Sequence, residues 1–132
     1  MFNGLDHIAI AVPDAEAALK LWRDRLGFQV LFREIVNHGS TLLVHLDLGN
    51  AQLQLVQPLT TDHPLSQWLE QHGPGLHHFC LAVEEVEKTA RELLDLEVEP
   101  GEPEPHQGTQ GKRALFLDTT STVGILVELT GG

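Results

Sequence analysis

The segment Leu5-Asp6-His7-Ile8-Ala9-Ile10-Ala11-Val12 indicates the architecture, because the chain repeats it as Leu76-His77-His78-Phe79-Cys80-Leu81-Ala82-Val83. Between residues 5–16 and 76–87, five of twelve aligned positions are identical, including His7 and His78. Each copy leads directly into a helical pattern of apolar residues. A strand-and-helix unit that occurs twice indicates two pseudo-symmetric modules, each with a histidine at the same point.

Strand alternation places both histidines beside small side chains. Because side chains alternate between the two faces of a strand, each histidine shares its face with two small residues: Ala9 and Ala11 in the first copy, Cys80 and Ala82 in the second. The large apolar side chains lie on the opposite face, where a helix covers them. A single histidine in this setting is usually half-buried and hydrogen-bonded locally, but its duplication favours a pair of ligands.

Composition restricts the class of protein. The chain has 132 residues, of which 42% are hydrophobic, so it holds enough apolar side chains for one packed domain. Its formal net charge of −11 argues against a nucleic-acid or anionic-membrane partner. It shows no membrane-spanning apolar run and no leader pattern, and its single cysteine, Cys80, suits a reducing compartment. We therefore expect a cytoplasmic protein without nucleic-acid or membrane partners.

The same order of elements is predicted in both halves. Periodicity and turn residues predict, in the first half, a helix over 14–26 capped by Asp14 and ended by Gly27, with strands over 5–12, 28–34, 41–48 and 51–57. The apolar stripe of this helix is expected to comprise Ala15, Ala18, Leu19, Trp22 and Leu26. In the second half they predict a helix over 85–96, a Pro/Gly-rich passage over 100–111, and strands over 76–83, 113–118 and 124–129. We expect an α+β fold in one domain over 1–132, with module one at about 1–57, a linker at 58–75 and module two at about 76–130.

A two-residue turn at Gly49-Asn50 fixes the register of one predicted hairpin. Counting outward from this turn pairs His45 with Gln54 across the two strands and places both on one face. On the last strand, Glu128 lies on the face opposite the residues that we expect to pack under the helices, Ile125, Val127 and Leu129. Gln54 and Glu128 therefore occupy comparable places in the two modules.

Two imidazoles, one amide and one carboxylate are predicted to converge: His7, His78, Gln54 and Glu128. Mixed nitrogen and oxygen donors suit a divalent ion with positions left open for water or substrate, unlike the thiolate sets of structural zinc. The alternative is an ordinary polar strand residue at Gln54 and a solvated carboxylate at Glu128. The coincidence of four donors favours a metal site, for cobalt, manganese, nickel, zinc or magnesium. The remaining histidines, such as His63, His72 and His106, are expected at the surface.

Five segments in order carry a resemblance to a known superfamily. They are LDHIAIAV (5–12), LGNAQLQLVQPL (48–59), GLHHF (75–79), GKRALFL (111–117) and GILVEL (124–129). On these motifs the sequence resembles the vicinal oxygen chelate (glyoxalase/bleomycin-resistance) superfamily and, within it, the methylmalonyl-CoA epimerase family. The resemblance implies a single vicinal oxygen chelate domain, whose paired βαβββ modules form a curved, cup-shaped sheet around a metal. It also implies a homodimer, and metal ligands at His7, Gln54, His78 and Glu128.

Two positions depart from the pattern of the epimerase family. Asn37 stands before His38-Gly39, where the family has an acidic residue that acts as one of two proton-shuttling bases. Asp118-Thr119-Thr120 replaces the family's His-Pro-Lys, which weakens the prediction of a coenzyme A tail. The resemblance implies Glu128 as the base on one face of the substrate carbon. Because Asn37 takes up no proton, we expect the second base to be His45, on the inner face of the hairpin, in preference to His38.

The resemblance implies a metal-dependent epimerase or isomerase that acts by enolate stabilisation on an acyl-CoA such as methylmalonyl-CoA. Lys112 and Arg113 are candidates for binding an anionic group, or else face solvent. A glyoxalase I-like lactoylglutathione lyase is one alternative, because it uses similar ligands and needs no acid at position 37. A metal-free binding or resistance protein of the same fold is another, although it has no need of four metal ligands. Extradiol dioxygenase chemistry is disfavoured, because Gln54 would be an extra ligand.

Overall fold

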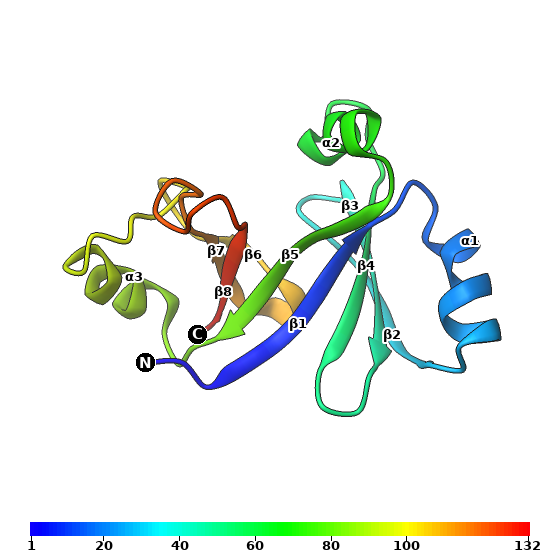
Figure 1. The fold of residues 1–132 in the computed structure, drawn as a ribbon, viewed down its shortest axis with the longest axis horizontal. Coiled ribbons are helices and arrows are strands. Elements are labelled where there is room, and N and C mark those ends of the chain that lie inside the picture. The colour runs from blue at the N-terminus through cyan, green and yellow to red at the C-terminus, as the bar shows by residue number, and fades with distance from the viewer. The chain divides into compact units, whose positions relative to one another are not determined.

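A strand, a helix and three further strands occur in this order twice along the chain (Figure 1). The computed structural model describes all of residues 1–132. The first series is β1 (Gly4–Ala11), α1 (Ala15–Leu19) continued by η1 (Lys20–Arg25), β2 (Gln29–Val36), β3 (Thr41–Asp47) and β4 (Gln52–Pro58). After α2 (Pro64–His72), the second is β5 (Gly75–Ala82), α3 (Val86–Leu94), β6 (His106–Gln107), η2 (Thr109–Gly111), β7 (Arg113–Phe116) and β8 (Val127–Gly131). The predicted α+β class is confirmed.

The chain forms two compact units, and β1 and β5 each contribute residues to both. The central unit is Ile8–His77, and the split unit combines Met1–His7 with His78–Gly132. The strand order is β2-β3-β4-β1 in the central unit and β1-β5-β8-β7-β6 in the split unit. None of the helices is long and apolar enough to cross a membrane.

The β3–β4 hairpin of the central unit has the register that its turn predicts. The Leu48 amide donates to the Ala51 carbonyl at 3.0 Å, and His45 lies opposite Gln54. Gly49 adopts a φ of 93°, which a residue without a side chain adopts at little cost. Alternate side chains of the hairpin form a core with β1 and α1: Val12, Ala15, Leu19, Val44, Leu46, Leu53 and Leu55. His45 and Gln54 therefore occupy the other face of the hairpin.

The predicted helix over 14–26 is present but changes its winding midway. Oδ1 of Asp14 accepts a hydrogen bond from the Ala17 amide at 3.2 Å, so the predicted N-cap is confirmed. From Lys20 onward the helix has π winding, and the Leu26 amide donates to the carbonyl of Leu21, five residues back. The wider turn rotates the side chains that follow. Leu26, expected on the apolar stripe, is consequently 51% exposed.

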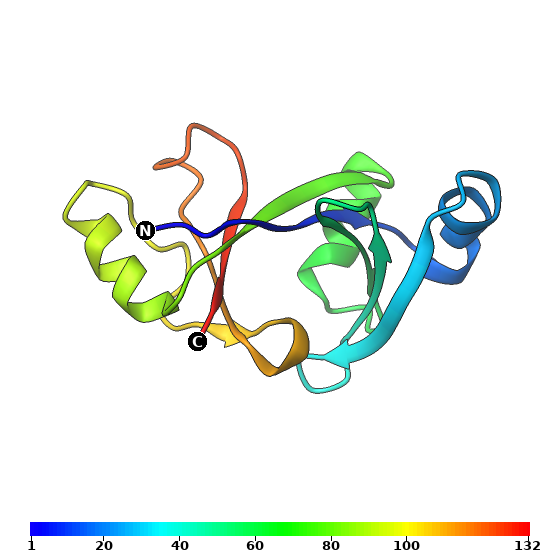
Figure 2. The ribbon, with the colours of Figure 1, turned by 90° about the horizontal axis from the view of Figure 1, so that it is seen from below.

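In the split unit, α3 lies against one side of β7 and β8 (Figure 2). Its apolar side chains Val86 and Leu93 pack in a core that includes Leu115 and Leu129. Strand β8 runs parallel to β5, with Glu128 opposite Cys80, and antiparallel to β7. This register brings the carboxylate of β8 beside a strand that carries one of the two duplicated histidines.

The last strand begins at Val127, three residues later than predicted. Val123 and Gly124 have φ values of 52° and 90°, and this left-handed backbone is incompatible with an extended strand. Ile125 therefore lies outside the strand and is 52% exposed, so the prediction that it packs under a helix is wrong. Val127 and Leu129 are buried as predicted, and Glu128 lies on the opposite face.

Candidate metal centre

Three of the predicted ligands meet inside the split unit. Nε2 of His7 on β1 lies 3.5 Å from Oε1 of Glu128 on β8, and Nε2 of His78 on β5 lies 3.3 Å from the same oxygen. All three ligand atoms lie within 4.8 Å of one another. The imidazole rings stand edge to face, with centroids 5.8 Å apart. The structure thus brings together two imidazole nitrogens and one carboxylate oxygen.

Strand register explains the convergence. The Asn3 amide donates to the Ala82 carbonyl at 2.8 Å, which aligns the start of β1 with the end of β5 and brings His7 next to His78. Glu128 is paired with Cys80, two residues beyond His78 on the same strand face. The site is largely withdrawn from water, because His7 is 2% exposed and Glu128 is 7% exposed. Buried charges of this kind persist only with partners.

Glu128 has a different partner for each carboxylate oxygen. Oε1 faces His7 and His78, whereas Oε2 lies 3.0 Å from Nε2 of His106. Burial by itself raises the pKa of this carboxyl, but the hydrogen bonds from His106, His7 and His78 outweigh it and hold the pKa well below the ordinary value. Glu128 is therefore ionised at neutral pH, as a metal ligand must be.

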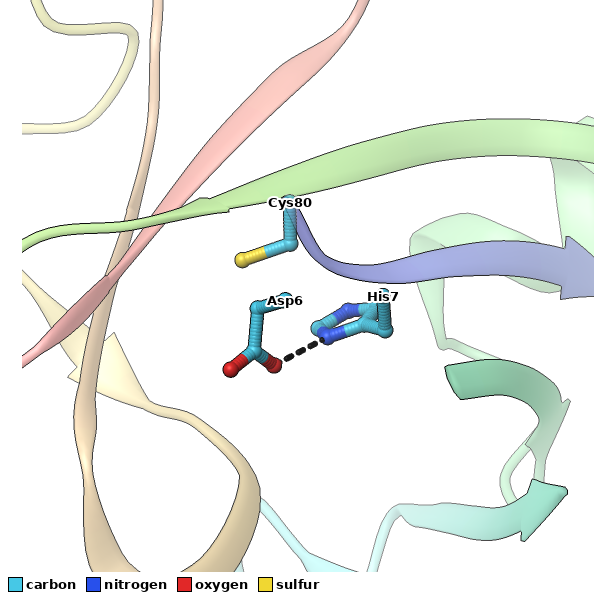
Figure 3. Close-up of side chains that lie close together, drawn as sticks. All are labelled: Asp6, His7 and Cys80. Carbon is cyan, nitrogen blue, oxygen red and sulfur yellow. Dashed lines mark hydrogen bonds and ion pairs between the residues drawn. The ribbon is translucent and has the colours of Figure 1, made fainter. Parts of the chain in front are cut away.

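His7 is oriented by its neighbour Asp6. Nδ1 of His7 donates to Oδ2 of Asp6 at 2.8 Å (Figure 3). This bond leaves Nε2 of the same ring to face Glu128 and His78. Burial lowers the pKa of His7, but the hydrogen bonds to Asp6 and Glu128 more than compensate and raise it above its ordinary value. A carboxylate behind the ring of a metal-binding histidine is a common device that fixes the tautomer and increases the ring's basicity. Asp6 has no such signal in the sequence, since strand alternation points it away from His7.

Cys80 lies beside Asp6 and His7, and the three side chains form a second group of possible ligand atoms (Figure 3). Its side chain is buried, and burial together with the carboxylates of Glu128 and Asp6 raises the pKa of the thiol far above its ordinary value. Cys80 is thus a small, buried side chain beside His7, held as the neutral thiol in the metal-free protein.

His106, expected at the surface, is only about a quarter exposed and contacts the candidate metal centre. Its Nε2 contacts Glu128, and its Nδ1 lies 2.9 Å from Oε2 of Glu102. The Pro/Gly-rich passage gave no periodic signal, because the strand that positions His106 is only two residues long and pairs with β7. His63 is also engaged: it caps α2 through the Leu65 amide and contacts the Thr41 hydroxyl at 2.8 Å. His72 is exposed as expected.

The two cations considered for anion binding both lie beside carboxylates. Nζ of Lys112 lies 3.4 Å from Oδ1 of Asp6. The Arg113 guanidinium forms an ion pair with Glu87. Each side chain is about half exposed, so each remains accessible to a ligand. Lys112 also strengthens the charge environment behind His7, because it helps to hold the pKa of Asp6, which is lowered first by its hydrogen bond to His7, below the ordinary value.

His45 and Gln54 belong to the central unit and are both buried there. Nδ1 of His45 lies 3.0 Å from Oε1 of Gln52, and Nε2 lies 3.1 Å from Oε2 of Glu34. Its ring stacks on Phe32, with centroids 4.2 Å apart. Glu34, which sequence reasoning missed, thus places a carboxylate three residues before Asn37, the position where the family's acid is absent.

His7, His78 and Glu128 fit a divalent cation. They offer two imidazole nitrogens and one ionised carboxylate oxygen within one small volume. Asp6 contacts Nδ1 of His7 and His106 contacts Oε2 of Glu128, and hydrogen bonds of this kind orient the ligands of a metal site. A three-residue set leaves positions open for water or for substrate oxygens, which is typical of catalytic rather than structural metals.

Comparisons with known proteins show the family and the fold. A family model described as the glyoxalase/bleomycin resistance protein/dioxygenase superfamily matches residues 6–116. The ethylmalonyl-CoA/methylmalonyl-CoA epimerase of Cereibacter sphaeroides is 36% identical, over 98% of this chain and 98% of that protein. The crystal structure of methylmalonyl-CoA epimerase from Mycobacterium tuberculosis superposes with a TM-score of 0.91 at 28% identity, over 98% of this chain and 88% of that one. A Streptomyces coelicolor methylmalonyl-CoA epimerase variant in complex with 2-nitronate-propionyl-CoA superposes with a TM-score of 0.89 at 29% identity, over 100% of this chain and 99% of that one.

Proposed function

We propose that this chain, which belongs to the glyoxalase/bleomycin resistance protein/dioxygenase superfamily, catalyses metal-dependent epimerisation of an acyl-CoA such as methylmalonyl-CoA. The family membership confirms the resemblance found in the sequence. Homology to epimerases over nearly the whole chain confirms the prediction of an epimerase-type enzyme. The observation that carries the proposed metal-dependent activity is the ionised, buried Glu128 carboxylate between the imidazoles of His7 and His78.

The chemistry needed is removal of a proton from the carbon next to a thioester carbonyl. His7, His78 and Glu128 would hold a divalent ion, which would supply a Lewis acid for substrate oxygens and offset the negative charge that develops there. Both histidine rings are held in place, because Asp6 hydrogen-bonds to the ring of His7 and Phe116 packs edge to face with the ring of His78. Burial of the ligands excludes water, which strengthens each electrostatic interaction in the site.

Glu128 is the proposed base on one face of the substrate carbon. Its carboxylate is ionised and so accepts a proton, and its two oxygens have separate partners. A base in position contributes roughly 10²–10⁴-fold to the rate of proton transfer. Replacing Glu128 therefore removes both a ligand and the base.

His45 is the proposed second base, with Glu34 as the residue that orients it. The Glu34 carboxylate and the Gln52 amide fix the two ends of the His45 ring, and Phe32 fixes its plane. This arrangement resembles the carboxylate–histidine pairs that serve as general bases. Gln54, the fourth ligand implied by the family resemblance, stays a prediction, and Gln54→Ala tests it through the affinity for Co²⁺.

The substrate class follows from the relatives. The Streptomyces coelicolor relative holds a propionyl-CoA analogue, and the Cereibacter sphaeroides relative acts on ethylmalonyl-CoA and methylmalonyl-CoA, as their names state. We extend an acyl-CoA substrate to this chain on that basis. We further propose a homodimer in the cytoplasm, and size-exclusion chromatography with light scattering measures the assembly directly.

Deuterium incorporation tests the activity. The metal-loaded protein in D₂O is expected to introduce deuterium at C2 of methylmalonyl-CoA, and chelation of the metal is expected to stop the exchange. Glu128→Gln is expected to slow the exchange by about 10²-fold or more. No exchange with the metal-loaded protein, together with turnover of a methylglyoxal–glutathione adduct, would replace the epimerase by the lyase. Failure to bind any divalent ion would favour a metal-free binding protein.

A further inference from the structure

A line of three side chains runs from the candidate metal centre to the protein surface. Oε2 of Glu128 contacts Nε2 of His106 at 3.0 Å, and Nδ1 of His106 contacts Oε2 of Glu102 at 2.9 Å. Exposure rises along the line, from a buried Glu128 to a His106 and a Glu102 side chain that are both about a quarter exposed. Both carboxylates are placed to accept, so both nitrogens of the His106 ring have acceptors.

Each outer member of the line is itself fixed in place. The Glu102 carboxylate accepts a second hydrogen bond, from the Phe116 amide at 2.7 Å, so β7 anchors it. The His106 ring stacks on the ring of Phe116, with centroids 5.2 Å apart and an interplanar angle of 22°. Pairing of β6 with β7, in which His106 lies opposite Ala114, fixes the backbone. His106 therefore has one orientation, which is set by three separate contacts.

The two carboxylate oxygens of Glu128 face different partners. Oε1 lies within 3.5 Å of the Nε2 atoms of His7 and His78, whereas Oε2 is turned toward His106. A carboxylate ligand binds a cation through one oxygen or through both, and the second mode consumes an additional coordination position. A hydrogen bond to one oxygen favours the first mode, because it holds that oxygen away from the ion.

We propose that His106, oriented by Glu102, is a positioning residue that restricts Glu128 to one-oxygen binding of the metal and thereby keeps a coordination position open for substrate. This inference rests on the proposed metal centre and specifies how that centre is held open. Nothing in the periodicity of the Pro/Gly-rich passage predicts it. Its physical basis is the hydrogen bond to Oε2 and the anchoring of His106 by β7.

Cobalt binding tests this role without requiring turnover. His106→Phe keeps an aromatic ring against Phe116 but removes the hydrogen bond to Glu128. We expect it to weaken Co²⁺ binding by ~10–100-fold, as loss of a group that hydrogen-bonds to a metal ligand typically does. We also expect it to alter the visible absorption of bound Co²⁺, because the number of carboxylate oxygens on the ion changes. His106→Gln, which retains an N–H donor, is expected to restore part of the affinity and the wild-type spectrum.

Two further variants keep the experiment decisive. Glu102→Gln leaves the His106 ring and its stacking in place, so it reports on orientation even if His106→Phe fails to fold by circular dichroism. We expect an intermediate loss of Co²⁺ affinity with a shifted spectrum. His72→Gln removes an exposed histidine from α2 and is the matched control, with no expected change in affinity or spectrum.

The outcomes separate this inference from the proposed function. Folded His106→Phe and Glu102→Gln proteins with wild-type Co²⁺ affinity and spectrum would overturn the positioning role and leave the metal centre intact. If the wild-type protein binds no Co²⁺, both the centre and the positioning role are wrong. If Co²⁺ binding depends on His106 but methylmalonyl-CoA shows no exchange, the positioning role holds and the substrate assignment is wrong.

Discussion

At the scale of single residues, Asp6 is the side chain on which the orientation of His7 depends. Asp6→Asn keeps the size of the side chain but removes the negative charge behind the imidazole. We expect ~10-fold weaker Co²⁺ binding, because the ring becomes less basic and its tautomer less fixed. Equilibrium titration measures this loss, with Asp24→Asn on the exposed surface of η1 as control. Equal affinities for Asp6→Asn and wild type would show that Asp6 serves only a structural purpose.

The same cluster makes the stability of the metal-free protein depend on pH. Burial lowers the pKa values of His7 and His106, but their carboxylate partners outweigh it and raise both pKa values above the ordinary value of 6.5. The two histidines therefore contribute fully to the free energy of unfolding below pH 6.5, and this contribution is lost as the pH rises through their pKa values in the folded protein. The pKa of Glu128 is lowered, so its contribution is lost as the pH falls. Urea denaturation should therefore show a free energy of unfolding that declines above about pH 6.5. The decline should be shallower in His106→Phe, and an identical slope would contradict this account.

Residues of the candidate site could be predicted from the sequence only where strand alternation determines which way the side chain points. His7, His78 and Glu128 were predictable, since a repeat and a two-residue period place them on one face. Asp6 was not, because its bond to the adjacent His7 departs from that alternation. His106 and Glu34 were not either, because their contacts depend on strand pairings between residues distant in sequence, β6 with β7 and β2 with β3. Long-range pairing leaves little trace in local periodicity.

At the scale of elements, the end of β8 leaves no room for a side chain at Gly131. A Cβ added there would overlap the carbonyl oxygen of Val83. Gly131→Ala is therefore expected to lower the free energy of unfolding by about 1–3 kcal/mol, because the end of β8 must shift. Gly75→Ala is the matched control, since a Cβ there meets nothing within 4 Å. Equal denaturation midpoints for the two variants would count against this packing.

Most elements were predictable, and the exceptions have local physical causes. The hairpin register followed from one glycine turn, and Asp14 capped its helix as expected. The apolar stripe failed at Leu26 because π winding changes the period of the helix. The last strand started late because Val123 and Gly124 adopt left-handed backbone. Propensity and pattern do not encode such departures, which depend on how the neighbouring segments are packed.

At the scale of the whole molecule, the sequence repeat accounts for the order of the elements and for two of the three converging ligands. Duplication places one histidine on β1 and one on β5, while Glu128 comes from the last strand of the second series. The chain carries a net charge of −11, and imidazoles together with Lys112 stabilise the ionised carboxylates of this centre. A bound divalent cation would add further positive charge beside them.

The stoichiometry of divalent metal bound by the purified protein tests whether His7, His78 and Glu128 form a metal centre. We predict one Co²⁺ ion per chain for the wild type by elemental analysis after dialysis. The double variant of His7→Ala and His78→Ala, folded by circular dichroism, is predicted to bind none. A wild-type protein that retains no ion, or a double variant that retains a full equivalent, would contradict a metal centre built on His7, His78 and Glu128.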